Sequence, residues 1–130
     1  MYKINTLLKF IFNISTLFLI ILSLFPGSLL GFLFYGDLGT QPDLIDNPFG
    51  TSINHFIGYL YVSTLGFFLH YKDKNFKNLI YAMFFLSFIL ELFHFVVPNR
   101  SFQLEDLIGN ILGVIIAYFL IKIYLFINRI

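Results

Sequence analysis

Long runs of apolar residues, interrupted by few charges, constrain this chain more than any other feature of its sequence. A helix needs about 20 mostly apolar residues to cross the hydrocarbon core of a bilayer. The chain offers four runs of about this length, at residues 7–25, 53–71, 76–97 and 104–127. Because 58% of its 130 residues are hydrophobic and only 12% are charged, a soluble fold would expose too much apolar surface. We therefore predict an all-α, polytopic membrane protein, in which residues 1–130 form one membrane domain, a bundle of about four transmembrane helices.

The first apolar run and the segment after it decide how much of the chain lies outside the spans. Residues 7–25 have Lys3 before them and Lys9 near their start, as in a signal peptide, but the small-residue pattern of a cleavage site is missing. We therefore expect this run to be retained as a span. Residues 26–52 form the longest non-spanning segment, and its apolar piece at 29–35 is too short to cross a bilayer. We expect that piece to lie in the membrane interface.

The distribution of positive charge indicates which way the bundle faces. The connection at 72–77 carries three lysines, whereas residues 26–52 carry three aspartates and neither Lys nor Arg. Cytoplasmic loops are enriched in Lys and Arg, so we expect a multi-pass protein of the cell (inner) membrane with both termini cytoplasmic. Lys9 and Arg129 agree with this orientation, and Arg100 is the exception. Nucleic acid is not expected as a partner, because the few basic residues form no stripe.

This topology brings scattered polar residues together in the extracytoplasmic half of the membrane. The candidates for a binding or functional site are His55, Glu91, His94, Arg100, Asp106 and Asn110. Glu91 is the most informative, because an ionisable residue inside a span is costly and usually marks a pathway or a site. The helical rise places Glu91 and Asn110 at similar depths, so we expect them to face one another, with His94 and Asp106 in a shallower layer. For Asp106 and Asn110, a structural role in helix capping and interhelical hydrogen bonding is as good an interpretation as a functional role.

Small residues on the last apolar run indicate how it packs. Asp106, Asn110, Gly113 and Ala117 recur every three or four residues and therefore share one face of a helix. Gly109 and Gly113 also form a GxxxG pair, which lets a neighbouring backbone approach closely inside a membrane. We expect the third and fourth spans to pack through this pair as an antiparallel hairpin.

A bound metal is a further interpretation, because Glu91 and His94 have the Glu-x-x-His spacing of helical iron, manganese and zinc sites. A second such pair is absent from the sequence, so His55 and Asp106 would have to complete the coordination. We therefore expect neither a metal nor another cofactor.

Residues 91–113 read ELFHFVVPNRSFQLEDLIGNILG, and this stretch resembles the core signature of the VanZ-like family of membrane proteins. In that signature a glutamate ends one span, a Pro-x-Arg turn follows, and an aspartate, an asparagine and a glycine mark the next span. The matching residues are Glu91, Pro98, Arg100, Asp106, Asn110 and Gly113, with His55 as the family's histidine in the preceding span. The resemblance covers residues 51–118 and departs from the family's pattern at His94, where glutamine is usual. It implies a multi-span helical protein whose namesake lowers susceptibility to the glycopeptide teicoplanin.

We expect the polar pocket to bind or modify the headgroup of a lipid or a lipid-linked envelope precursor in the outer leaflet. Arg100 would hold an anionic group, because a guanidinium matches the geometry of phosphate and carboxylate. A lowered glycopeptide susceptibility is implied by the resemblance alone. The expected partners are membrane lipids or a lipid-linked amphiphile, and either a second copy of the chain or another membrane protein.

Two alternatives stay open. One is a membrane enzyme in which Glu91 or Asp106 acts as general base and His55 or His94 as general acid. The other is a non-catalytic assembly protein, whose polar residues only set the helix register. The sequence assigns no catalytic residue, so we favour binding over catalysis.

Labelling of single cysteines tests the orientation, since the native chain contains none. Asp43→Cys should react with an impermeant maleimide in intact cells, because residues 26–52 are expected to face outward. Lys74→Cys should react only after the membrane is permeabilised. The reverse pattern would place the polar residues on the cytoplasmic side.

Overall fold

The computed structural model describes residues 2–46, 48–50 and 52–128, and this part of the chain forms five helices and no strand. The predicted all-α class is therefore confirmed. The helices are α1 (Tyr2–Leu24), α2 (Leu29–Tyr35), α3 (Ser52–His70), α4 (Phe76–Phe93) and α5 (Leu104–Ile127). Arg129, which the charge argument uses, lies outside the described residues.

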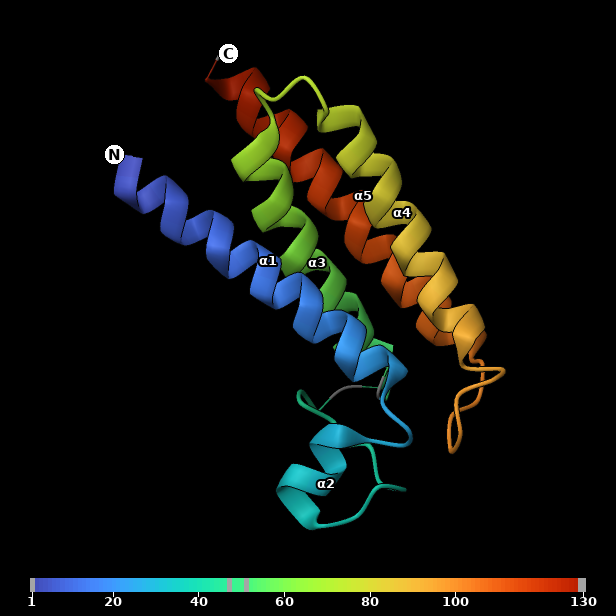
Figure 1. The fold of residues 1–130 in the computed structure, drawn as a ribbon. Helices are drawn as coiled ribbons and strands as arrows, with labels where there is room; N and C mark the ends of the chain where they lie inside the picture. The colour runs from blue at the N-terminus through green and yellow to red at the C-terminus, as the bar shows by residue number, and fades with distance from the viewer. Residues whose placement is uncertain (1, 47, 51, 129–130) are drawn as a thin grey trace.

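The four long helices run side by side, and the short α2 lies beyond one end of this bundle, here called the α2 end (Figure 1). The start of α1, the end of α5 and the connection from α3 to α4 lie at the opposite end, here called the terminal end (Figure 1). Consecutive long helices therefore alternate in direction, which makes α3 and α5 parallel. α3 is the most extensively packed of the long helices, since it packs against α1 and α4 and most closely against α5.

Three of the long helices, α1, α4 and α5, are long and apolar enough to cross a membrane. α3 has 19 residues but is not in this group. It carries polar residues such as Asn54, His55 and Ser63, which lower its mean hydropathy. Polar side chains within membrane helices face the bundle interior, and the extensive packing of α3 against its neighbours allows this. A membrane-protein fold is therefore supported, and the fourth span stays a prediction.

α4 ends at Phe93, before the predicted end of the third span at residue 97. Residues 94–96 donate their backbone N–H groups to carbonyls three residues back, so the helix tightens before it stops. Pro98 explains the stop, because a proline disfavours helical geometry in the preceding residue and has no N–H to donate. Asn99 then takes a left-handed conformation with φ of 57°, and the chain turns back to α5.

α2 is the short apolar piece that the sequence places between the first two spans. The Ser28 hydroxyl begins the helix by accepting a hydrogen bond from Gly31 N at 2.9 Å. Gly36 ends it with φ of 70°. The location of α2 in the membrane interface stays a prediction.

Gly109 and Gly113 bring α5 against α3, and not against α4 as predicted. A Cβ atom added to Gly113 would lie 2.6 Å from the Phe56 carbonyl oxygen and 2.8 Å from the Leu60 nitrogen. A Cβ atom added to Gly109 would lie 2.9 Å from the Ser52 carbonyl oxygen. α4 also packs against α5, but the glycine pair faces α3. The spacing of small residues along a helix identifies the face that carries them. It does not say which neighbouring helix packs against that face.

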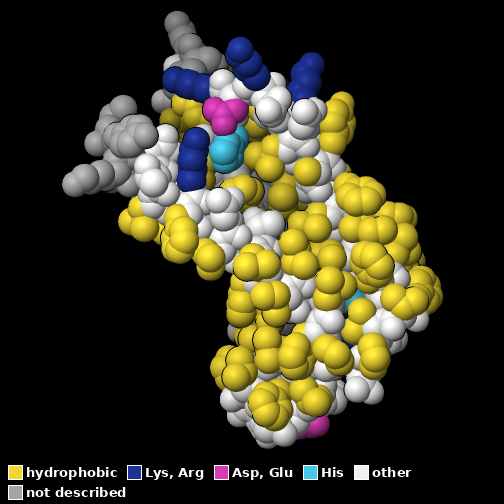
Figure 2. Space-filling model, viewed as in Figure 1, with side chains coloured by type: hydrophobic (Ala, Val, Ile, Leu, Met, Phe, Trp, Pro, Cys, Tyr) yellow, Lys and Arg dark blue, Asp and Glu magenta, His cyan; other side chains and the backbone are white. Residues whose placement is uncertain are grey.

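The outer surface of the bundle is apolar, and positive charge gathers at the terminal end. Figure 2 shows apolar side chains over most of the visible face and basic side chains at the end that carries the termini. Phe10, Phe85 and Phe126 are 62%, 65% and 84% exposed. Such an extensive apolar surface is suited to contact with lipid tails.

Gly113→Ala should destabilise the protein, because the added methyl group would overlap the α3 backbone and push α3 and α5 apart. Overpacking of this kind costs about 1–3 kcal/mol, so the midpoint of thermal unfolding in mild detergent should fall. Gly58→Ala is the matched control, since its methyl group would meet only Leu19 Cδ1, at 3.7 Å. Its midpoint should stay or rise, because alanine favours helix over glycine. Equal midpoints for the two variants would show that the α3–α5 contact contributes nothing to stability.

Candidate functional site

A hydrogen-bonded network surrounds His55. α3 carries Ser52 and His55 one helical turn apart, and α5 presents Asp106 and Asn110 in the same way. His55 Nδ1 lies 3.2 Å from Asn110 Oδ1, and His55 Nε2 lies 3.4 Å from Asp106 Oδ2. The Ser52 hydroxyl donates to Asp106 Oδ1 at 2.6 Å. Asn110 connects this network to α4, because its Nδ2 donates to the Ser87 carbonyl at 3.3 Å.

A second network joins Glu91 to His94 at the end of α4. His94 Nδ1 lies 3.0 Å from Glu91 Oε1, which also accepts from Gln103 N at 3.1 Å. His94 Nε2 donates to the Ser23 carbonyl of α1 at 2.9 Å. Since Nε2 holds a hydrogen, the contact between Nδ1 and Glu91 Oε1 must hold one further proton, on either atom. Both side chains are almost fully buried, so this proton is shielded from water.

The two networks adjoin one another. The rings of His55 and His94 meet edge to face, with centroids 6.4 Å apart. One ligand-type atom from each of His55, Glu91 and Asp106 lies within 4.8 Å of the other two. Glu91 Oε2 is buried and makes no hydrogen bond with any described residue. These three side chains therefore form a group that could hold a metal ion.

Arg100 attaches the turn between α4 and α5 to the end of α1. Its Nη2 donates to the Leu22 carbonyl at 2.8 Å, and its Nε donates to the Phe25 carbonyl at 3.2 Å. Carbonyls at the end of a helix lack partners within the helix, and the helix dipole favours a cation there. Burial lowers the pKa of Arg100 below its ordinary value, and the carboxylates of Glu91 and Asp106 act in the opposite direction. The guanidinium therefore stays protonated at neutral pH.

The partners within the cluster differ from the predicted ones. Asn110 bonds to His55 and to the α4 backbone instead of facing Glu91, and Glu91 bonds to His94 in its own helix. Asp106, which was predicted to lie in one layer with His94, contacts Ser52 and His55 of α3. Depth along a helix predicts which residues share a layer, but the rotation of the helix about its axis decides which of them touch.

Some of the contributing groups are absent from the predicted site. Ser52 orients Asp106, and its i, i+3 spacing from His55 is a signal that could have identified it. The carbonyls of Leu22, Ser23 and Phe25 are backbone groups, so no side-chain pattern could have revealed their role. Ala117, predicted to be a packing residue, is fully buried on α5.

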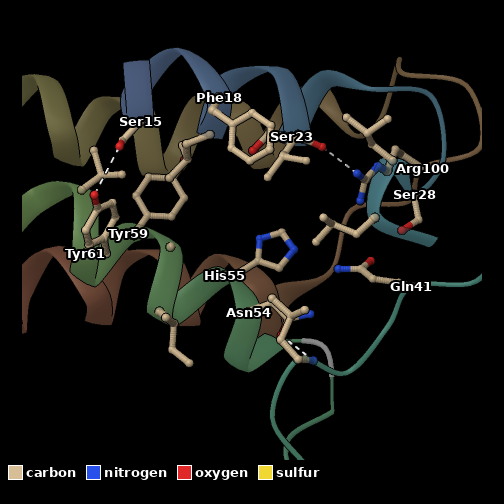
Figure 3. Close-up of a pocket in the computed structure, with 18 residues that line it drawn as sticks. Ser15, Phe18, Ser23, Ser28, Gln41, Asn54, His55, Tyr59, Tyr61 and Arg100 are labelled. Atoms are coloured by element: carbon tan, nitrogen blue, oxygen red, sulfur yellow. Dashed lines mark hydrogen bonds between the residues drawn. The ribbon is translucent and has the colours of Figure 1, made fainter. Parts of the chain in front are cut away.

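An apolar cavity of about 280 Å³ lies between α1 and α3 (Figure 3). Phe18 and Tyr59 line its middle, and His55 projects into it from α3 (Figure 3). Arg100 and Gln41 lie together at one end of it (Figure 3). The cavity thus has an apolar middle, with Arg100 and Gln41 at one end and the hydrogen-bonded hydroxyls of Ser15 and Tyr61 at the other (Figure 3).

A second, polar cavity of about 240 Å³ lies between the segment that follows α1 and the turn between α4 and α5. His94 and Asp106 are part of its lining. Ser28, Gln41 and Arg100 line both cavities. The two cavities therefore meet at these three residues.

Comparison with known families adds one finding. A family model described as VanZ/LLP1 matches residues 4–126, which is nearly the whole chain. The matched region includes the polar cluster and all four long helices. No curated protein and no solved structure matches the chain.

Asn110→Leu should weaken the contacts among α3, α4 and α5, because leucine resembles asparagine in shape but cannot hydrogen-bond to His55 or to the Ser87 carbonyl. A buried polar group left without a partner costs about 1–3 kcal/mol, so the unfolding midpoint in detergent should fall. Asn128→Leu is the control, since Asn128 is exposed and donates within its own helix to the Tyr124 carbonyl. A midpoint for Asn110→Leu no lower than that of the control would show that the polar network does not hold the helices together.

Proposed function

The chain belongs to the VanZ/LLP1 family, and from this premise we propose that it binds the anionic headgroup of a membrane amphiphile in the outer leaflet. The amphiphile is a lipid or a lipid-linked envelope precursor. The protein acts as a multi-pass protein of the cell (inner) membrane. In this proposal α3 crosses the bilayer with α1, α4 and α5, and both termini are cytoplasmic.

The observation that carries the proposal is the junction of an apolar and a polar cavity at the α2 end. The cavities have volumes of about 280 and about 240 Å³, and they share Ser28, Gln41 and Arg100. An amphiphile has the same division into an apolar and a polar part. Its headgroup fits the polar cavity, and the first part of its chain fits the apolar cavity between α1 and α3.

Arg100 supplies the positive charge for an anionic headgroup. Two of its nitrogens donate to main-chain carbonyls, while Nη1 makes no hydrogen bond within the part of the chain that the structure describes. No carboxylate of the described residues forms an ion pair with it. A guanidinium without an internal anion is suited to bind phosphate or carboxylate from outside.

The distribution of charge supports a site in the outer leaflet. Lys72, Lys74 and Lys77 lie in or next to the α3–α4 connection at the terminal end, whereas the cavities lie toward the α2 end. The enrichment of lysine in cytoplasmic loops would place the terminal end inside the cell. The polar cavity would then open toward the outer surface.

Binding accounts for the cluster better than catalysis does. A general base must reach the proton that it takes from a substrate. Glu91 lines neither cavity, and both ring nitrogens of His94 are already engaged in hydrogen bonds. Asp106 lines the polar cavity, but its Oδ1 accepts from Ser52 and its Oδ2 lies beside His55.

A cellular role follows from the resemblance to VanZ. A lipid-linked envelope precursor held by the protein is withheld from a glycopeptide that recognises the same precursor. Lowered glycopeptide susceptibility is therefore the part of the proposal that depends on the precursor being the amphiphile.

Lipid retention tests the proposal. Protein purified in mild detergent is offered phosphatidylglycerol, which is anionic, or phosphatidylcholine, which is zwitterionic, and bound lipid is counted by native mass spectrometry. The wild-type protein should retain phosphatidylglycerol preferentially. Arg100→Gln should weaken that retention about tenfold, which corresponds to about 1.4 kcal/mol. Lys77→Gln removes an exposed cation next to the terminal end and should change nothing.

Two further measurements distinguish a loss of lipid binding from a loss of protein stability. Gly58 lines the apolar cavity, so Gly58→Leu should fill it and lower the retention of both lipids. Thermal midpoints are recorded for every variant, because Arg100 also attaches α1. Equal retention by Arg100→Gln and Lys77→Gln, or a lipid loss that only follows the fall in midpoint, would overturn the proposed function.

A further inference from the structure

We infer that His55, Glu91 and Asp106 bind a divalent transition-metal ion at the centre of the polar cluster. They come from three helices, α3, α4 and α5, and one ligand-type atom of each lies within 4.8 Å of the other two. Glu91 and Asp106 are only 1% and 3% exposed. The sequence contains only one Glu-x-x-His pair, and no metal was expected because a second pair is absent. The structure instead assembles ligands across helices.

In each of the two carboxylates, one oxygen accepts a hydrogen bond and the other oxygen is available to an ion. Glu91 Oε1 is bonded to His94 and to a backbone N–H, whereas Glu91 Oε2 is buried without a partner among the described residues. Asp106 Oδ1 accepts from Ser52, whereas Asp106 Oδ2 faces His55. Metal ligands are typically oriented in this way by outer hydrogen bonds, while their remaining atoms bind the ion.

The hydrogen atom on His55 can be placed from its neighbours. Asn110 Nδ2 donates to the Ser87 carbonyl, so the atom that faces His55 Nδ1 is the acceptor Asn110 Oδ1. Nδ1 therefore carries the hydrogen, and Nε2 of a neutral His55 presents a lone pair. That lone pair faces Asp106 Oδ2, a second acceptor, at 3.4 Å. Two acceptors at this distance need a cation between them, either a proton or a metal ion.

Distance and charge favour the metal ion. Two ligand atoms that are each about 2.1 Å from a tetrahedral zinc ion lie roughly 3.4 Å apart. The His55 Nε2 to Asp106 Oδ2 distance of 3.4 Å matches this value. A proton between these atoms would still leave Glu91 Oε2 buried and unpaired, which is costly. A divalent ion between the three side chains would place positive charge beside both Glu91 Oε2 and Asp106 Oδ2.

The ligand set indicates the class of ion. One imidazole with two carboxylates suits Zn²⁺, Mn²⁺ or Fe²⁺, whereas Mg²⁺ and Ca²⁺ prefer oxygen ligands alone. Three protein ligands leave at least one coordination position open. His55 lines the apolar cavity and Asp106 the polar one, so water or an anionic group can reach that position. Binding of an amphiphile headgroup to the ion rests on the proposed function, and binding of the ion itself does not.

Metal analysis of the full chain tests the inference. The protein in mild detergent is stripped with EDTA, equilibrated with Zn²⁺ or Mn²⁺ in the absence of added lipid, and analysed by inductively coupled plasma mass spectrometry. We expect close to one ion per chain for one of these metals. Glu91→Gln and Asp106→Asn should weaken metal affinity at least about tenfold. His70→Gln is the matched control, because His70 also contacts a carboxylate, that of Asp73, but lies at the terminal end.

Ser52→Ala keeps the test decisive if the ligand variants fail to fold. This change removes only the hydroxyl that orients Asp106. It should weaken metal affinity about 10- to 100-fold, as is typical of outer hydrogen-bond partners. Wild-type protein that takes up neither metal, or that binds metal with the same affinity as Ser52→Ala, overturns the inference.

Lipid retention distinguishes this inference from the proposed function. A protein that binds no metal but retains phosphatidylglycerol overturns the metal site alone. A protein that binds one ion through these ligands but retains no lipid supports the metal site and overturns the proposed function.

Discussion

The close contact between α3 and α5 is the constraint on which the rest of the structure depends. Gly109 and Gly113 let the two parallel backbones touch, and helices in lipid associate through such packing because no hydrophobic driving force acts between them. The same contact sets His55 beside Asp106 and Asn110. A wider separation would leave these polar side chains facing hydrocarbon, where each would cost free energy. The small residues on α5 therefore allow the close helix contact that gives the polar residues on α5 their hydrogen-bond partners.

The end of α1 is attached to this cluster through its backbone. Arg100 and His94 donate to carbonyls of Leu22, Ser23 and Phe25, which have no partners within the helix. In a low-dielectric environment such carbonyls must be satisfied by neighbours, so the attachment stabilises the bundle. Arg100 and His94 also line the polar cavity. The residues that close the bundle at the α2 end are thus the ones that would face a ligand in the polar cavity.

The two proposals concern neighbouring but different atoms of one polar region. Arg100 Nη1 is available to an anionic headgroup at the junction of the cavities, and the free atoms of His55, Glu91 and Asp106 point to a cation deeper between the helices. An ion there would add positive charge near Arg100 and so strengthen the attraction of an anionic group. Buried carboxylates and a bound anion are compatible only if such positive charge lies between them.

The sequence by itself determined the all-helical class, the positions of the long helices and the small face of α5, because run length and periodicity depend only on residue order. It also identified Glu91 as an ionisable residue that lipid would not tolerate without partners, and His55 as a candidate for the same site. The tertiary structure decided the partners. It paired α5 with α3, Glu91 with His94 and Asp106 with His55, and it ended α4 early enough for Arg100 to reach α1. These choices depend on the rotation of each helix about its own axis, which is set by packing against its neighbours and is not encoded in the periodicity of one helix alone.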